Sequence, residues 1–248
     1  LNGTGTVILN GEDDKLSTVE NVNGKAPVFY GKSEKNQCGK ENCIYATEIR
    51  NLGLDGMKAV FHFPECTKEV EIPIPGEHNV LNALAGACVG MELGLDVEQI
   101  CAGIKKAQTI GGRTNLIHAN DMLIIDDCYN ANPISMKASI DVLNMAIGRK
   151  VAVLGNMGEL GDTAEALHAE VGTYAAEQNV DLVCGIGDLT RSLVEEASKG
   201  ANTEALWFAD NESFIQAIPD IIKDGDNVLV KASHGMNFPQ IVHALEEL

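Results

Sequence analysis

Short apolar runs alternate with longer amphipathic stretches from about residue 111 to the end of the chain. Within 163–178, Leu167, Val171, Tyr174 and Ala175 recur at helical spacing, which predicts a helix with one buried face. Buried strands that alternate with helices are typical of a parallel sheet covered on both faces. We therefore predict a doubly wound α/β domain over residues 111–248. Its predicted strands are 122–125, 150–154, 181–186, 205–208 and 227–230, and helices are predicted after Pro133 and over 163–178, 189–199, 211–222 and 238–248.

The first part of the chain has a different pattern, in which short β-like runs are separated by Gly or Asn. Two helical stretches follow at 78–93 and 97–107, with Gly94 expected to end the first and Asp96 to cap the second. Because this part opens on a strand with nothing before it, we expect residues 1–110 to be the end of another domain. Its predicted strands are 6–10, 27–30, 43–49, 58–63 and 69–74.

Charge and cysteine usage restrict the environment and the partners. The 248 residues include 36 acidic and 18 basic side chains, a net charge of −18. Such a charge repels nucleic acid and anionic membranes, and no apolar run approaches the ~20 residues that span a bilayer. We therefore expect no nucleic-acid partner and no membrane insertion. Seven scattered cysteines, several in apolar runs, indicate a reducing cytoplasm, and the spacing of Cys38 and Cys43 favours a surface loop over a zinc site.

The segment 123–136 carries most of the candidate chemistry. An apolar run is followed by two carboxylates, a polar turn, Pro133 and a predicted helix. Ligands of open α/β sheets collect outside the carboxyl ends of the strands, so these side chains are expected to face a nucleotide or a polar substrate. The alternative is an ordinary connection in which Asp and Asn are turn and cap residues. The side chains concerned are Asp126, Asp127, Tyr129, Asn130 and Asn132.

Two further groups could contact a nucleotide. Asn79 and Asn82 lie three residues apart in the first turn of a predicted helix, where two amides can read an adenine edge or hold a phosphate. The alternative is that Asn79 caps this helix. Arg113, after two glycines at the domain boundary, could reach a phosphate, although a solvated linker arginine is the commoner case.

Two segments follow later strands of the predicted sheet. Lys231 comes at the end of the last strand and could meet a phosphate or carboxylate; the alternative is a surface lysine. The loop 155–161 superficially resembles a dinucleotide-binding glycine loop but lacks its spacing. We expect Asn156, Glu159 and His168 to line the same crevice as the 126–132 loop. No Gly-x-x-x-x-Gly-Lys-Ser/Thr motif occurs in the sequence.

Taken in order, these motifs resemble those of the Mur ligases. The most specific block is Asp-Asp-x-Tyr-Asn-Ala-Asn-Pro, at the position where other branches of that family carry an Asp-Tyr-(Ala/Gly)-His type of sequence. Two positions depart from the usual pattern, His234 where many relatives have Arg and Cys128 where Ser is common. The matching segments are Asn10–Asp14, Gly76–Asn82, Gly112–Arg113, Asp126–Met136, Leu154–Gly161 and Val230–Ser233.

The resemblance implies a particular domain organisation. Mur ligases have a substrate-anchoring domain, a central ATPase domain and a Rossmann-like C-terminal domain. Residues 1–110 would be the C-terminal part of the central, ATP-binding domain, and 111–248 the complete C-terminal domain. The phosphate-binding loop and the ligands of Mg²⁺ are then expected upstream. ATP and Mg²⁺ are the implied cofactors.

The resemblance also implies residue roles. Asn79 and Asn82 would contact the adenine, Arg113 the phosphates and Asp127 the ribose hydroxyls. Arg113 and Lys231 would be the catalytic side chains. Of the remaining residues, Tyr129 and Asn130 would lie beside the nucleotide, and Asn132 and Ser233 beside the substrate.

The implied reaction is ATP-driven amide formation in peptidoglycan precursor synthesis. D-alanyl-D-alanine would be joined to UDP-N-acetylmuramoyl-tripeptide through an acyl phosphate. Without a phosphate-binding loop, we expect this chain to be inactive by itself. Two alternatives stay open: a stand-alone nucleotide- or peptide-binding module, and a related amide ligase with another substrate.

Overall fold

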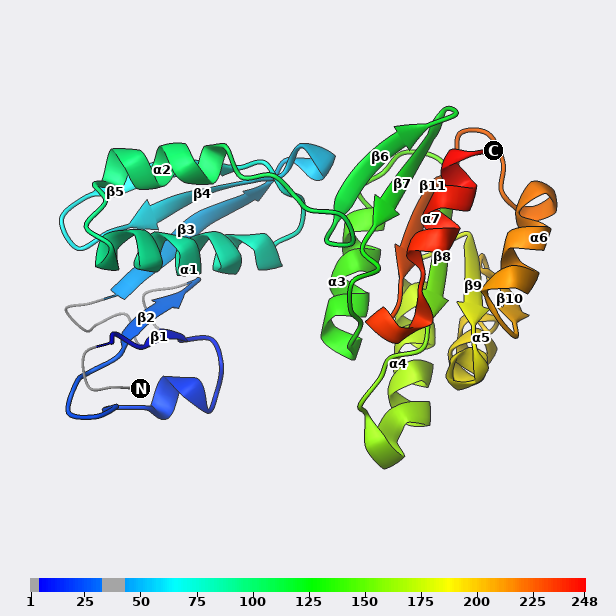
Figure 1. Cartoon of the computed structure of the whole chain (residues 1–248), viewed down its shortest axis with the longest axis horizontal. Coiled ribbons are helices and arrows are strands. Elements are labelled where there is room, and N and C mark those ends of the chain that lie inside the picture. Colours follow the sequence, from blue (N-terminus) through cyan, green and yellow to red (C-terminus); the bar gives the residue numbers. More distant parts are fainter. Residues whose placement is uncertain (1–4, 33–42) are drawn as a thin grey trace. The chain divides into compact units, whose positions relative to one another are not determined.

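The computed structural model describes residues 5–32 and 43–248, so the predicted loop at Cys38 lies outside the described residues. The chain forms two compact units, Leu1–Gln108 and Thr109–Leu248 (Figure 1). Each unit has a β-sheet and a hydrophobic core of its own. In the described ranges, no helix is long and apolar enough to cross a membrane.

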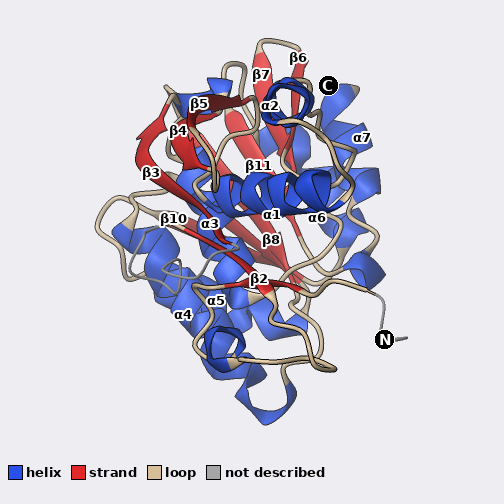
Figure 2. Ribbon diagram, turned by 90° about the vertical axis from the view of Figure 1, so that its left-hand side faces the viewer, coloured by secondary structure: helices blue, strands red, loops and turns tan. Residues whose placement is uncertain are grey.

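The first unit is a five-stranded sheet with two helices packed against it (Figures 1 and 2). The strands lie in sequence order. Strands β1, β2 and β3 pair in parallel, and β4 pairs antiparallel with both β3 and β5. Asp96 caps α2 through a capping box with Gln99, as the sequence predicts. The elements are β1 (Ile8–Asn10), β2 (Val28–Gly31), β3 (Cys43–Asn51), β4 (Met57–His62), β5 (Thr67–Ile72), α1 (His78–Glu92) and α2 (Val97–Lys105).

The second unit is a six-stranded sheet of order β10-β9-β8-β11-β7-β6, in which only β6 is antiparallel. Helices connect the parallel strands, so the predicted α/β class is confirmed. The strands are β6 (Asn115–Ala119), β7 (Met122–Asp126), β8 (Lys150–Gly155), β9 (Leu182–Ile186), β10 (Glu204–Phe208) and β11 (Asn227–Lys231). The helices are α3 (Pro133–Leu143), α4 (Ala164–Glu177), α5 (Arg191–Ala197), α6 (Asn211–Ile221) and α7 (Pro239–Glu246).

Strand β6 is an element that the sequence reasoning missed. It pairs with β7 through a two-residue turn, Asn120 and Asp121, whose φ angles are +49° and +58°. Positive φ at both turn residues gives the backbone twist that tight hairpins favour, and Asn and Asp tolerate it better than other side chains.

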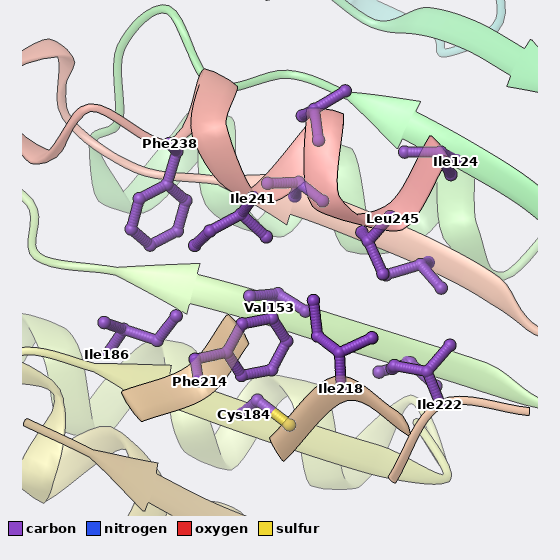
Figure 3. Packing of buried hydrophobic residues seen from close by; sticks show 14 of the residues in the cluster. Ile124, Val153, Cys184, Ile186, Phe214, Ile218, Ile222, Phe238, Ile241 and Leu245 are labelled. Atoms are coloured by element: carbon purple, nitrogen blue, oxygen red, sulfur yellow. The ribbon is translucent and has the colours of Figure 1, made fainter. Parts of the chain in front are cut away.

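Helices α6 and α7 bury one face of this sheet (Figure 3). Phe214 and Ile218 from α6, and Phe238 just before α7, meet strand residues such as Val153 and Cys184, all at most 2% exposed. Because strand side chains alternate between faces, the equally buried neighbours of Val153 point to the opposite face. Helices α3 and α5 contact the strands, and α4 packs on α3 and α5.

Helix α4 forms where predicted, and Val171 and Ala175 of its predicted face are buried, but the buried face is rotated toward His168 and Gly172. His168, Val171, Gly172 and Ala175 are buried, whereas Leu167 is partly exposed. Gly172 allows a close helix contact, since a Cβ there would lie 2.0 Å from the carbonyl oxygen of Leu193.

Five cysteines of the described residues carry free thiols, while Cys43 is disulfide-bonded, which the sequence reasoning did not anticipate. Burial raises the pKa of the Cys88 and Cys184 thiols to about 12, so both behave as small apolar side chains.

Candidate functional site

Strand order brings two distant polar segments together in the second unit. Because β11 lies between β8 and β7, the residues that follow β7 and those that end β11 share one edge of the sheet. Parallel sheets of this type bind ligands at such an edge.

Asp127 is held by donors from three different elements. Its Oδ2 accepts hydrogen bonds from Lys231 Nζ at 2.5 Å and Ser139 Oγ at 2.6 Å, and its Oδ1 accepts one from the backbone N–H of Thr114 at 2.9 Å. Each carboxylate oxygen has two acceptor positions, so only Oδ1 retains a free one. Any hydroxyl that Asp127 binds must therefore come to Oδ1.

Lys231 is a buried residue, 2% exposed, so the alternative of a surface lysine is wrong. Its ammonium donates to Asp127 Oδ2 and to the Asn130 carbonyl oxygen at 3.0 Å, with the Asp127 carbonyl oxygen 3.4 Å away. All three of its hydrogens thus face protein oxygens. In this structure Lys231 ties β11 to the loop after β7.

Asp126 points in another direction and is 7% exposed. Its Oδ2 accepts the backbone N–H of Gly112 at 2.7 Å, and its Oδ1 accepts the Cys128 thiol at 2.9 Å. Burial, followed by this hydrogen bond to a carboxylate, raises the pKa of Cys128 to about 12. Cys128 is therefore a donor in the loop and not a nucleophile.

The two carboxylates together fasten the segment that carries Arg113. The backbone N–H of Gly112 donates to Asp126, and that of Thr114 donates to Asp127. The Gly112 carbonyl oxygen accepts the Tyr129 N–H at 2.9 Å. Thr114 has a φ of +48°, an uncommon conformation for a β-branched residue. Such strain persists only where surrounding contacts enforce it, and here the bond to Asp127 does so.

Arg113 is exposed and stacks on an aromatic ring. Its guanidinium carbon lies 4.2 Å from the ring centroid of Tyr129, and that ring lies 5.5 Å from the ring of His234. Arg113 makes no side-chain ion pair within residues 5–32 and 43–248, so its donors face solvent.

The two asparagines of the loop make local bonds. Asn132 is the N-cap of α3 and forms a capping box with Ser135, as the alternative reading of this segment predicted. The Asn130 side chain accepts the N–H of Ala131 at 2.8 Å. The Asn132 amide nitrogen stays available to a ligand, since the cap uses only the oxygen.

The expectation that His168 lines the crevice is wrong, because it is fully buried beneath the 155–161 loop. Its Nδ1 donates to the Ala164 carbonyl at 2.6 Å, and its Nε2 accepts the Met157 N–H at 2.9 Å. These two bonds require the neutral ring, and burial lowers the pKa of His168. Above it, the Gly158 N–H donates to Ser233 Oγ at 2.7 Å. Ser233 thus connects this loop to the end of β11.

Asn79 and Asn82 form a second polar group, in the first unit. Asn82 Nδ2 donates to Asn79 Oδ1 at 2.9 Å, and Asn79 Nδ2 donates to the Pro75 carbonyl at 2.8 Å. The alternative that Asn79 caps α1 is wrong, because Glu77 holds that position and no side chain caps the helix. The outer amide, Asn82, is exposed and keeps a free acceptor and a free donor.

The two amides border a cavity of about 360 Å³ between α1, α2 and β5. Its walls are apolar, so a flat heterocycle could bury its faces there and present its polar edge to Asn82. The main apolar side chains are Ile72, Ile74, Ala83, Leu95, Ile100 and Ile104.

A metal site is not formed by these groups. In the part of the chain that the structure describes, no cluster of three His, Cys, Asp or Glu side chains could hold a metal ion. Asp126 and Asp127 already accept hydrogen bonds on all four oxygens, which leaves little room for a cation.

Sequence reasoning missed Thr114 and Ser139 as partners of Asp127. For Ser139 a signal existed, since a serine stands among the buried positions of α3. No such signal existed for Thr114, because its backbone N–H and not its side chain contacts Asp127.

Comparison with known proteins gives the same family for both units. Residues 1–90 match the family model of the Mur ligase middle domain, and residues 112–234 match that of the Mur ligase glutamate ligase domain. The chain is 30% identical over 246 residues to UDP-N-acetylmuramoyl-tripeptide--D-alanyl-D-alanine ligase of Escherichia coli K12, and 31% identical over 251 residues to that of Bacillus subtilis 168. The two alignments cover 98% and 100% of this chain and 52% of each relative.

A solved structure shares the fold. A crystal structure of MurF from Acinetobacter baumannii superposes with a TM-score of 0.82 at 29% identity, covering 98% of this chain and 52% of that one. The chain therefore spans about half the length of the curated relatives and of the solved structure that it matches.

Proposed function

The chain belongs to the Mur ligase family, whose members are ATP-dependent ligases, and from this we propose that it is the C-terminal part of such a ligase. The proposed reaction joins D-alanyl-D-alanine to UDP-N-acetylmuramoyl-tripeptide in peptidoglycan precursor synthesis. Residues 1–110 would complete the central ATP-binding domain, and residues 111–248 would be the C-terminal domain. A cytoplasmic location is proposed from the family and is consistent with the five free thiols, whereas the disulfide of Cys43 is uncommon in a reducing compartment.

The observation that carries this proposal is the cavity bordered by the paired amides of Asn79 and Asn82. An adenine needs apolar contact on its faces and one donor and one acceptor at its edge. The cavity walls supply the contact, and Asn82 supplies both polar groups because its partner occupies only one of its hydrogens. Asn79 would orient Asn82 and stand next to the base.

Arg113 supports the phosphate side of the proposal. In a chain with a net charge of −18, an anionic ligand needs a local cation without a carboxylate partner. Arg113 is exposed and meets this need, and a guanidinium binds phosphate oxygens two at a time. Asp127 would accept a ribose hydroxyl at Oδ1, and Tyr129 and Asn130 would lie beside the nucleotide.

The binding site for the D-alanyl-D-alanine dipeptide is proposed at the end of β11 and the start of α3. Ser233 and the Asn132 amide nitrogen would contact the dipeptide. Lys231 would support catalysis by holding the Asp127 loop, since its ammonium is already occupied by protein oxygens. The residues described here do not fit a Mg²⁺ site, so we assign the ion no step on this chain.

A calorimetric titration with ADP tests the nucleotide site. We expect Asn82→Ala to weaken ADP binding about two- to tenfold, the effect of losing one or two hydrogen bonds. Asn202→Ala, an exposed asparagine outside the cavity, is the matched control. Equal affinities for the wild type and Asn82→Ala would exclude the proposed adenine contact.

An activity assay separates the proposal from a stand-alone binding module. Phosphate release would be followed with ATP, the tripeptide substrate and D-alanyl-D-alanine. We expect no turnover by these 248 residues and turnover when the central-domain segments of a Mur ligase are supplied on the same chain. Turnover by the 248 residues alone would contradict the proposal, and inactivity of the joined protein would favour the binding module.

A further inference from the structure

Tyr129 is placed to control the direction of the Arg113 guanidinium. Backbone bonds bring the two residues together, because the Tyr129 N–H donates to the Gly112 carbonyl at 2.9 Å. A Cβ on Gly112 would lie 3.2 Å from both the N and the Cβ of Tyr129, so the two backbones are in direct contact. Asp126 closes the arrangement by accepting the Gly112 N–H. The base of the Arg113 side chain is therefore fixed.

The guanidinium of Arg113 contacts the ring of Tyr129. Its guanidinium carbon lies 4.2 Å from the Tyr129 ring centroid, well within cation–π range, while no ion pair of Arg113 is formed within the described ranges. A free arginine side chain has considerable rotamer entropy to lose on binding. Stacking on the ring restricts the guanidinium and so reduces that loss.

From this geometry we propose that Tyr129 is a positioning residue, which holds the Arg113 guanidinium by stacking so that its donors meet the phosphate oxygens of the ligand. The inference rests on the proposed function for the role of Arg113. It assigns to Tyr129 an effect through Arg113 instead of a contact of its own with the ligand. His234, whose ring lies 5.5 Å away, restricts the Tyr129 ring in turn.

The first test measures stacking directly and needs no ligand. In the NMR spectrum of the 248-residue chain, ring current should shift the Arg113 δ-proton resonances upfield. Tyr129→Phe should keep this shift, and Tyr129→Leu should abolish it. Tyr174→Leu is the matched control, because Tyr174 also lies near a cation, 5.5 Å from Lys137, but on α4. An unchanged Arg113 resonance in Tyr129→Leu would overturn the inference.

The second test uses inorganic pyrophosphate as the probe, followed through the Arg113 Nε–Hε resonance. Tyr129→Leu should weaken pyrophosphate binding about two- to fivefold, the range of an exposed cation–π contact, and Tyr129→Phe should restore it. In an Arg113→Met background, Tyr129→Leu should have no further effect when binding is followed by calorimetry. Additive effects of the two substitutions would show that Tyr129 acts independently and overturn the inference.

The outcome is separable from that of the proposed nucleotide site. If pyrophosphate does not perturb Arg113, this inference fails, while the effect of Asn82→Ala on ADP still decides the adenine contact. If Asn82→Ala leaves ADP binding unchanged but the Tyr129 cycle behaves as expected, the adenine contact fails and the positioning role stands.

Discussion

The ammonium of Lys231 lies 2.5 Å from Asp127 Oδ2, and the side chains of the two residues are 3% and 14% exposed. The pair joins the end of β11 to the loop after β7, 104 residues apart in sequence. This ion pair therefore lies within the candidate site and also holds two distant segments of the domain together.

Removal of one partner should be costly. We expect Lys231→Met to lower the free energy of unfolding by about 2–3 kcal/mol, because the partly buried Asp127 carboxylate would keep its Ser139 and Thr114 donors but lose its cation. Asp127→Asn in the same chain should recover part of this loss, since no charge remains to be neutralised. Urea denaturation measures all three variants. Lys223→Met, at an exposed lysine, should change stability little, and an equal effect of both lysine substitutions would argue against the pair.

The close approach of α4 and α5 depends on a glycine. A Cβ at Gly172 would lie 2.0 Å from a backbone oxygen of Leu193, so Gly172→Ala must move one helix. We expect a loss of about 1–3 kcal/mol, as for other overpacked sites. Gly86→Ala on α1 is the control, because its Cβ would meet nothing within 4 Å and should stabilise the helix by about 0.5–1 kcal/mol. Thermal denaturation measures both variants. A lower melting temperature for Gly172→Ala and a higher one for Gly86→Ala would support the close packing, and a change of the same sign in both would contradict it.

The buried His168 should make stability depend on pH. Burial lowers its folded-state pKa below the usual 6.5, so the unfolded chain binds more protons in the interval between the two values. Stability is therefore fully present above about pH 6.5 and falls as the pH decreases below it. The free energy of unfolding of the wild type should fall more steeply from about pH 7.5 to about pH 5.5 than that of His168→Gln.

Thiol reactivity should follow burial. The pKa of Cys128 and of Cys184 is raised to about 12, so neither forms appreciable thiolate at pH 8. We expect iodoacetamide to alkylate Cys66, which is partly exposed, well before either of them. Peptide mass mapping after timed alkylation measures the order. Early labelling of Cys128 would show that its bond to Asp126 opens readily in solution.

Much of the fold could be predicted from local patterns. The buried parallel strands read as continuous apolar runs, and Asp96 shows its capping role through the Gln three residues later. Strand β6 escaped prediction because its five residues include His118 and only partly buried apolar side chains. Its turn, Asn120-Asp121, lacks the glycine that signals most two-residue hairpins.

The candidate site was predictable only as far as its position. The two carboxylates at the end of β7 predict a polar strand end, but the partners of Asp127 come from Thr114, Ser139 and Lys231, which no local pattern links to it. The role of His168 was misjudged for a related reason. The apolar spacing of α4 correctly predicts the burial of Val171 and Ala175. The buried face also includes His168 and Gly172 in place of Leu167 and Tyr174, because a ring and a bare backbone fit the neighbouring segments there.

The hydrogen bonds around Asp127 determine how a ligand would be received. Its lysine, serine and backbone donors all belong to the protein and fasten the loop from three separate segments, so the fold itself holds the carboxylate in position. The groups left for a ligand to contact are then mainly the exposed Arg113 guanidinium and the Asn132 amide nitrogen. The arrangement of the carboxyl edge of this sheet is therefore coupled to the folding of the whole domain, because the contacts that hold it join residues 12 to 104 positions apart in sequence.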